Sequence, residues 1–81
     1  MSGSFFAGIW TSTKGKWPVD YREEEFVYLI RGKVRLTSAD GTSRSYKAGD
    51  AFMIPSGFKG FWETLEPVRK YYAIWDPNAV M

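Results

Sequence analysis

The residues best suited to chemistry lie in the segment VDYREEEFVYLIRG, residues 19–32, where three consecutive glutamates run into an apolar stretch. Like charges repel and are normally solvated, whereas the apolar residues that follow are of the kind that folding buries. Two interpretations are open. The acids are a solvated approach to a strand, or one carboxylate lies inside the protein, where it could act as a general acid or base.

The chain contains no histidine and no cysteine, which narrows the chemistry further. Cysteine nucleophiles, thiolate zinc sites and imidazole acid–base pairs are therefore excluded. Carboxylates and carbonyl oxygens suit magnesium, calcium or manganese, but usually only where several acids converge. We therefore expect no cofactor and no tightly held metal, with weak divalent-cation binding as the most that such ligands would support.

Length and composition limit the class of protein. The 81 residues suffice for one domain, which we expect to span residues 1–81 with a disordered tail at residues 1–4. The net charge of +2 is scattered along the chain, which argues against nucleic acid as a partner. No apolar run reaches membrane-spanning length and no signal segment opens the chain, so we expect a cytoplasmic protein without membrane association.

Nearly every segment has the pattern of a short strand bounded by turn residues, and no window has helical periodicity. Asp40-Gly41 is typical of a hairpin turn, and Pro18 predicts an edge strand or bulge. The pattern predicts an all-β sandwich or barrel. The expected strands cover residues 5–11, 17–21, 25–31, 33–37, 42–46, 51–54, 60–64 and 68–75.

The strand expected at residues 25–31 is apolar on both faces. Alternation places Glu25, Val27 and Leu29 on one face and Phe26, Tyr28 and Ile30 on the other. We expect one face to line a cavity and the other to pack on a second sheet or a second subunit. Together with the 19% aromatic content and the aromatic first strand, this predicts a homodimer.

Two stretches resemble the signature motifs of the cupins, small β-barrels of the jelly-roll type. The first runs from Glu25 over six residues to Gly32, and the second from Gly49 over five residues to Pro55 and then Gly57. Over residues 8–74 the chain is similar to the compact single-domain cupins grouped with ureidoglycine aminohydrolase. The resemblance implies an RmlC-like, cupin-type double-stranded β-helix.

The resemblance also implies a metal site made of Glu25 and three histidines. The corresponding positions in this sequence are Val19, Tyr21 and Gly60, none of which is histidine. The chain departs from its metal-dependent relatives at this point, so their aminohydrolase reaction is not expected to carry over.

The resemblance favours the interpretation in which Glu25 lies inside, as a candidate catalytic residue. A buried carboxylate needs a partner, which Lys70 as counter-charge or a tyrosine or tryptophan donor could supply. Ordinary core packing is the alternative for the tryptophans, and a solvated surface position is the alternative for Tyr21 and Lys70. The candidate ligand-binding residues are Trp17, Tyr21, Glu25, Trp62, Lys70 and Tyr72.

Three functions agree with these residues. The first is binding of a small polar ligand with amine or hydroxyl groups, whose carbons would pack on the rings. The second is an enzyme acting on a small nitrogenous or sugar-like substrate, with Glu25 as acid or base. The third is a dimeric interaction domain with a filled interior. Whether the protein is an enzyme stays open at this point.

Overall fold

The computed structural model describes residues 4–76, and within that range it contains six strands and no helix. This confirms the expected all-β fold. The strands are β1 (Ser4–Ser12), β2 (Gly15–Asp20), β3 (Glu24–Ser38), β4 (Ser43–Lys47), β5 (Ala51–Ile54) and β6 (Lys59–Asp76).

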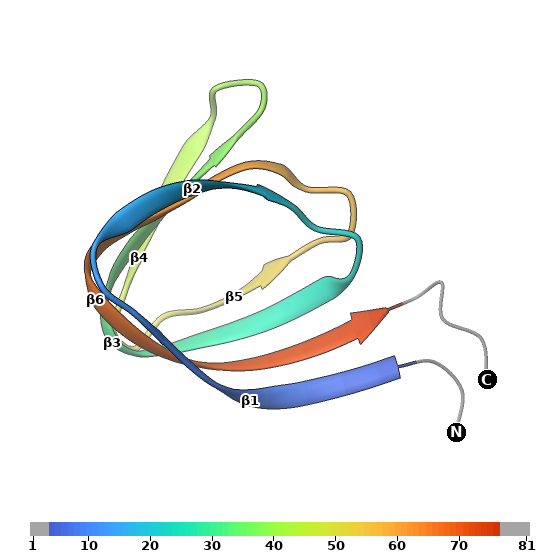
Figure 1. Cartoon of the computed structure of the whole chain (residues 1–81), viewed down its shortest axis with the longest axis horizontal. Coiled ribbons are helices and arrows are strands. Elements are labelled where there is room, and N and C mark those ends of the chain that lie inside the picture. Colours follow the sequence, from blue (N-terminus) through green and yellow to red (C-terminus); the bar gives the residue numbers. More distant parts are fainter. Residues whose placement is uncertain (1–3, 77–81) are drawn as a thin grey trace.

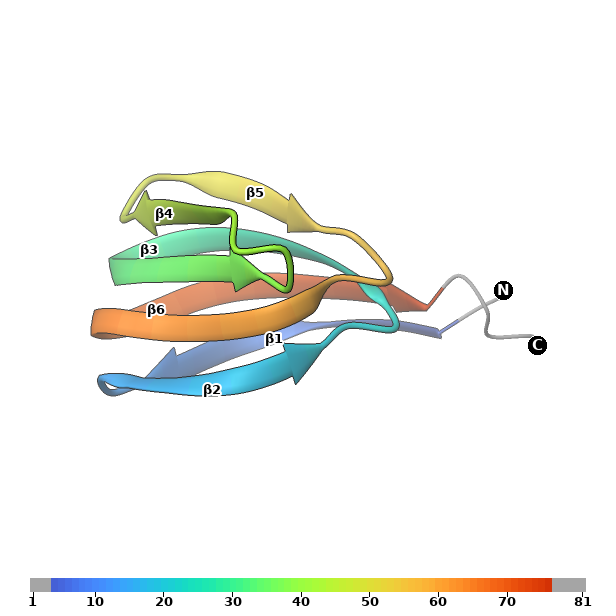
Figure 2. The ribbon, with the colours of Figure 1, turned by 90° about the horizontal axis from the view of Figure 1, so that it is seen from above.

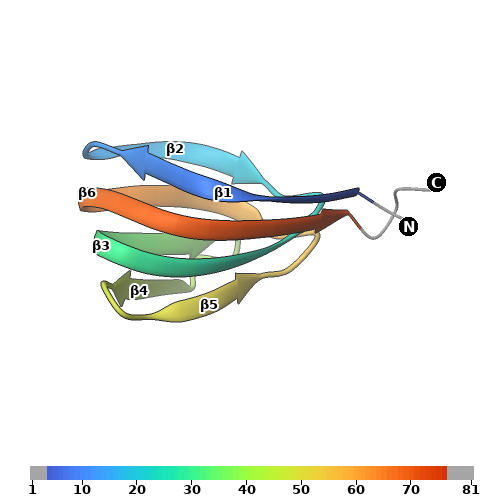
Figure 3. The ribbon, with the colours of Figure 1, turned by 90° about the horizontal axis from the view of Figure 1, so that it is seen from below.

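The two long strands, β3 and β6, pair with each other and organise the fold. The second half of β6 pairs with β1 and the first half with β2, while β5 and β4 pair with the two successive halves of β3. Two antiparallel layers result, ordered β1-β6-β3-β5 and β2-β6-β3-β4. Figure 1 shows both long strands curving from one layer into the other, and Figures 2 and 3 show them at the centre of both layers.

The sequence predicted strand ends at Gly32 and at Glu66-Pro67, and this was wrong. The pairing of β3 with β6 continues through these residues with shifts in register, so the expected strands merge in pairs. Gly32 has a φ of 93°, and a Cβ there would lie 2.2 Å from the carbonyl oxygen of Pro67. A bulge bends a strand without ending its hydrogen-bonded pairing. Gly32 therefore allows β3 to bend at this point, where its positive φ is tolerated, and does not end the strand.

The core lies between the two layers and follows the predicted alternation. Its buried apolar residues are Val27, Leu29, Val34, Leu36, Phe52, Ile54, Trp62 and Val68. On the opposite face of β3, Phe26, Tyr28 and Ile30 remain 43%, 40% and 37% exposed. No second sheet covers this face among residues 4–76, so that alternative is wrong, and a second subunit stays a prediction.

The ends of the described range bear on two further expectations. Ser4 begins β1 and is not part of a tail, and the rest of the expected tail lies outside the described residues. Within residues 4–76 there is no helix of a length and hydrophobicity that would cross a membrane.

Candidate functional site

Glu25 lies inside the protein, near the start of β3. It pairs with Ile54 of β5 and Ile74 of β6, and only 5% of its surface is exposed. The residues just before it are more exposed: Glu23 and Glu24 are half-buried, and Arg22 is exposed. Of the three consecutive glutamates, only the last one therefore has its carboxylate in the interior of the protein.

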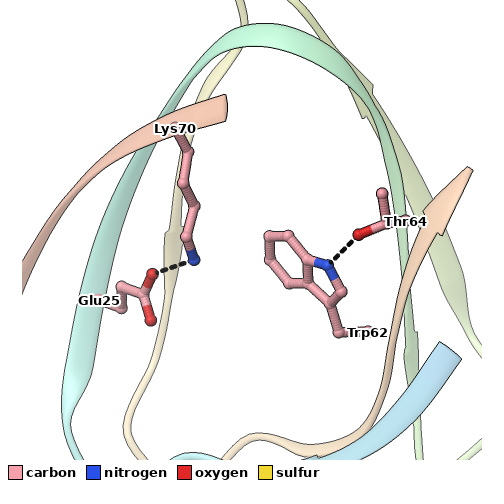
Figure 4. Close-up of polar contacts among 4 residues, drawn as sticks. All are labelled: Glu25, Trp62, Thr64 and Lys70. Carbon is pink, nitrogen blue, oxygen red and sulfur yellow. Dashed lines mark hydrogen bonds and ion pairs between the residues drawn. The ribbon is translucent and has the colours of Figure 1, made fainter. Parts of the chain in front are cut away.

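Lys70 supplies the counter-charge for this carboxylate. Its Nζ donates a hydrogen bond of 2.6 Å to Oε2 of Glu25, and its own exposure is 6%. The two residues are four positions apart in the β3–β6 ladder, because Lys70 pairs with Leu29 and Glu25 with Ile74. The lysine side chain extends across the interior to reach the carboxylate, as Figure 4 shows.

Aromatic rings surround the lysine ammonium. Its Nζ lies 4.4 Å from the ring centroid of Trp62, 4.8 Å from that of Trp10 and 6.0 Å from that of Tyr72. These rings replace part of the lost hydration through cation–π attraction. Burial lowers the pKa of Lys70, and the neighbouring Glu25 carboxylate opposes this shift.

Trp62 is held by a hydrogen bond of its own. Its indole N–H donates to Oγ1 of Thr64 at 2.9 Å, and that oxygen lies 3.1 Å from Oγ of Ser12. The indole therefore does not donate to Glu25, which was one of the donors expected from the sequence. Figure 4 shows the ring fixed by Thr64 with the lysine ammonium between it and the carboxylate.

A pocket of about 320 Å³ opens beside this ion pair, between the two layers. All six sequence-predicted residues line it, so the structure places them together. Two further residues, Trp10 and Ile74, were missed by the sequence analysis. Trp10 pairs with Lys70 across β1 and β6, but no motif in the first strand indicated which of its faces is inside. The lining residues are Trp10, Trp17, Tyr21, Glu25, Trp62, Lys70, Tyr72 and Ile74.

Tyr21 lies between β2 and β3, where two backbone hydrogen bonds hold it. Its N–H donates to the carbonyl of Phe58 at 2.8 Å, and its carbonyl accepts from Gly57 at 2.7 Å. Burial, reinforced by the charge of Glu25, raises the pKa of the Tyr21 phenol. The phenol is therefore a neutral hydrogen-bond donor at the pocket across the physiological range.

Glu25 has one oxygen free for a ligand. Oε2 accepts from Lys70, and Oε1 has no protein donor within residues 4–76. Since no fully buried side-chain oxygen in that range lacks a partner, Oε1 keeps some exposure to solvent, and Glu25 lines the pocket. The pocket therefore offers an acceptor, the lysine N–H groups and aromatic walls.

Comparison with known proteins identifies the family. Residues 1–72 match the family described as EutQ-like cupin domain. The chain belongs to this cupin family. A search of curated proteins gave no match. The jelly-roll fold expected from the sequence is confirmed by this family and by the solved structures that resemble the chain.

Three solved structures of cupin relatives illustrate the similarity. A DUF861 family protein from Thermotoga maritima is 35% identical with a TM-score of 0.78, and the match covers 80% of this chain and 74% of that one. A putative ethanolamine utilization protein Q from Salmonella typhimurium is 27% identical with a TM-score of 0.82, covering 93% and 60%. A DUF861 family protein of unknown function from Pseudomonas syringae pv. tomato is 30% identical with a TM-score of 0.79, covering 86% and 30%. This cupin chain therefore spans less than two thirds of the latter two proteins.

The residues of this cupin domain do not fit a divalent metal ion. The described residues contain no cluster of three histidine, cysteine, aspartate or glutamate side chains that could hold one. Val19 pairs with Gly60, and a Cβ on Gly60 would lie 1.8 Å from the carbonyl oxygen of Thr37, so no side chain fits there. The Lys70 ammonium already lies against Glu25 and would repel a second cation.

Proposed function

We propose that this cupin domain binds a small polar organic molecule in the pocket, without a histidine-held metal. The main support is the buried Glu25–Lys70 pair beside an open, aromatic-lined volume. Ligand pockets typically combine apolar and aromatic walls with a few convergent polar groups, and a volume of about 320 Å³ suits a small molecule.

The polar groups favour a particular ligand chemistry. A hydroxyl group can donate to Oε1 of Glu25 and accept from Nζ of Lys70, while the carbons beside it pack on Trp17 and Tyr72. A ligand ammonium is less suited, because Lys70 already lies among the rings that would attract it. Neutral hydroxylated or amide-bearing compounds are therefore the ligands that we expect, ahead of amines.

An enzymatic reaction at the same site is the alternative within this proposal. The resemblance to the ureidoglycine aminohydrolase group does not support its reaction here, because Val19, Tyr21 and Gly60 stand at its three histidine positions. Glu25 would instead act as the acid or base through Oε1, on a substrate held by the same contacts.

Nuclear magnetic resonance tests the binding directly. Titration with small polyols, hydroxy acids, ureides and amines should shift the indole signals of Trp10 and Trp62, with hydroxylated compounds ahead of amines. Glu25→Gln should weaken binding at least about tenfold, as expected for one lost hydrogen bond to a charged group. Glu63→Gln, on the surface, is the matched control. Equal binding by the two variants, or no shift with any compound, would contradict the proposal.

We also propose that this chain forms a homodimer through the outer aromatic face. That face comprises Ile9, Phe26, Tyr28, Met53, Tyr71 and Trp75, all exposed and on one side of the β1-β6-β3-β5 layer. The rings of Tyr28 and Tyr71 stack at its centre, 6.4 Å apart. Exposed patches rich in aromatics are typical of subunit interfaces, and a second copy brings an identical aromatic patch.

Sedimentation of engineered variants tests the dimer. Tyr28→Glu should convert a dimer at micromolar concentration into a monomer, because it places a charge in the centre of the interface. Phe61→Glu is the matched control, since Phe61 is an exposed aromatic residue of the other layer. A wild-type monomer, or equal association of both variants, would contradict this arrangement.

A further inference from the structure

We propose that Lys70 forms a reversible covalent imine with small carbonyl compounds, such as aldehydes, that enter the pocket. This inference rests on the proposed function, because the carbonyl compound must first occupy the same pocket. Three observations support it. The lysine nitrogen lies in an aromatic cage, a carboxylate lies 2.6 Å away, and both groups line an open volume.

The first requirement is an uncharged lysine amine, because only the neutral nitrogen is a nucleophile. Burial favours the neutral form by lowering the pKa of Lys70. Proton transfer along the hydrogen bond to Glu25 leaves a neutral amine and a neutral carboxyl group, so no net charge has to be created or expelled. The other titratable groups of the pocket are Tyr21 and Tyr72, and the raised pKa of Tyr21 keeps that phenol uncharged.

The reaction balances with the residues present. The Lys70 nitrogen attacks the carbonyl carbon, and the resulting alkoxide takes a proton from that nitrogen to give a neutral carbinolamine. The carboxyl group of Glu25 then donates its proton to the carbinolamine hydroxyl, which leaves as water while the C=N bond forms. In sum, the lysine ammonium and the carbonyl compound give a protonated imine and water. Glu25 returns to its carboxylate form, and no oxidant or reductant is consumed.

The product is also stabilised by the same surroundings. A protonated imine is a cation at the position of the original ammonium, 4.4 Å from the ring centroid of Trp62 and 4.8 Å from that of Trp10. The cation–π attraction and the charge of Glu25 therefore act on the product as they do on the free lysine. Lys59, on the same strand but exposed, lacks this environment and provides an internal comparison.

Reductive trapping tests the proposal on the whole wild-type chain. Propanal and sodium cyanoborohydride are added near neutral pH, where the hydride converts an imine into a stable propylamine. Peptide mass spectrometry then compares the rates of propylation at Lys70 and Lys59. Lys70 should react faster, by about tenfold for each unit by which its pKa is lowered from the ordinary lysine value. Its advantage should shrink as the pH approaches the ordinary lysine value of 10.5.

A second measurement separates the imine from simple binding. Propane-1,2-diol has a similar carbon skeleton and no carbonyl group, and its binding is followed through the indole signals of Trp10 and Trp62. Faster labelling of Lys70 than of Lys59 supports the imine. Equal or slower labelling, together with diol-induced shifts, overturns the imine and leaves the binding function standing. Equal or slower labelling without diol-induced shifts overturns both.

Discussion

The buried Glu25–Lys70 pair makes a quantitative prediction about stability. Lys70→Met would leave the Glu25 carboxylate in the interior without its counter-charge, and Glu25→Leu would do the same to the ammonium. Removing one partner of a buried pair destabilises a protein by about 3–5 kcal/mol. An 81-residue domain has a total unfolding free energy of about 4–12 kcal/mol, at roughly 0.05–0.15 kcal/mol per residue. Either single change is therefore expected to remove a large part of the stability.

The double variant should behave differently from the sum of the single ones. With both charges replaced by apolar side chains no unpaired charge remains, and such replacements are often neutral or stabilising by about 1–4 kcal/mol. Urea unfolding followed by tryptophan fluorescence would give the unfolding free energies of the wild type, the two single variants and the double variant, which together form a double-mutant cycle. The coupling energy should therefore be at least several kcal/mol, larger than the interaction of any exposed pair.

The surface pair of Arg35 and Glu63 provides the matched control for this cycle. Its charged atoms are 3.5 Å apart, and its side chains are 46% and 29% exposed. Exposed pairs contribute about 0–1 kcal/mol, so Arg35→Met with Glu63→Leu should show little coupling. A coupling for Glu25 and Lys70 as small as that of the surface pair would refute the buried-pair reasoning.

Two further predictions concern pH and the bend. The lowered pKa of Lys70 means that the unfolded chain binds this proton more tightly, so the unfolding free energy should rise as pH increases through the folded-state pKa of Lys70. The raised pKa of Tyr21 acts oppositely above its ordinary value of 10.0, so stability should fall there. Urea unfolding across alkaline pH checks this: Lys70→Met should lose the rise and Tyr21→Phe should lessen the fall. Gly32→Ala should destabilise more than Gly41→Ala, because both have φ of 93° but only Gly32 lies against backbone atoms; equal losses in thermal unfolding would contradict this.

The fold could be predicted from the sequence because two local signals agree throughout the chain. The two-residue period of a strand separated the two faces of the 25–31 segment, and the glycine and proline positions marked the changes of direction. The same signals failed at Gly32, since a bulge and a turn both favour glycine and differ only in whether pairing continues afterwards. That difference depends on β6, which is distant in the sequence.

The candidate site could be predicted in part for a similar reason. The motif spacing indicated that Glu25 points inward, and Trp62 was among the candidate ligand-binding residues. The specific contact between Glu25 and Lys70 was only one of several choices, because it requires the lysine to extend across four ladder positions. Trp10 could not be found, because the first strand has no motif that distinguishes its two faces.

The ion pair raises a question about why the pocket stays hollow in so small a domain. A short chain buries a smaller fraction of its surface than a long one, and it gains most by filling its interior with apolar side chains. Glu25 and Lys70 instead occupy inward positions on β3 and β6 and leave about 320 Å³ beside them. Since apolar replacement of such a pair is often stabilising, stability alone does not account for the two charges. The proposed ligand binding uses both groups and the space beside them, so it would account for the pair where stability does not.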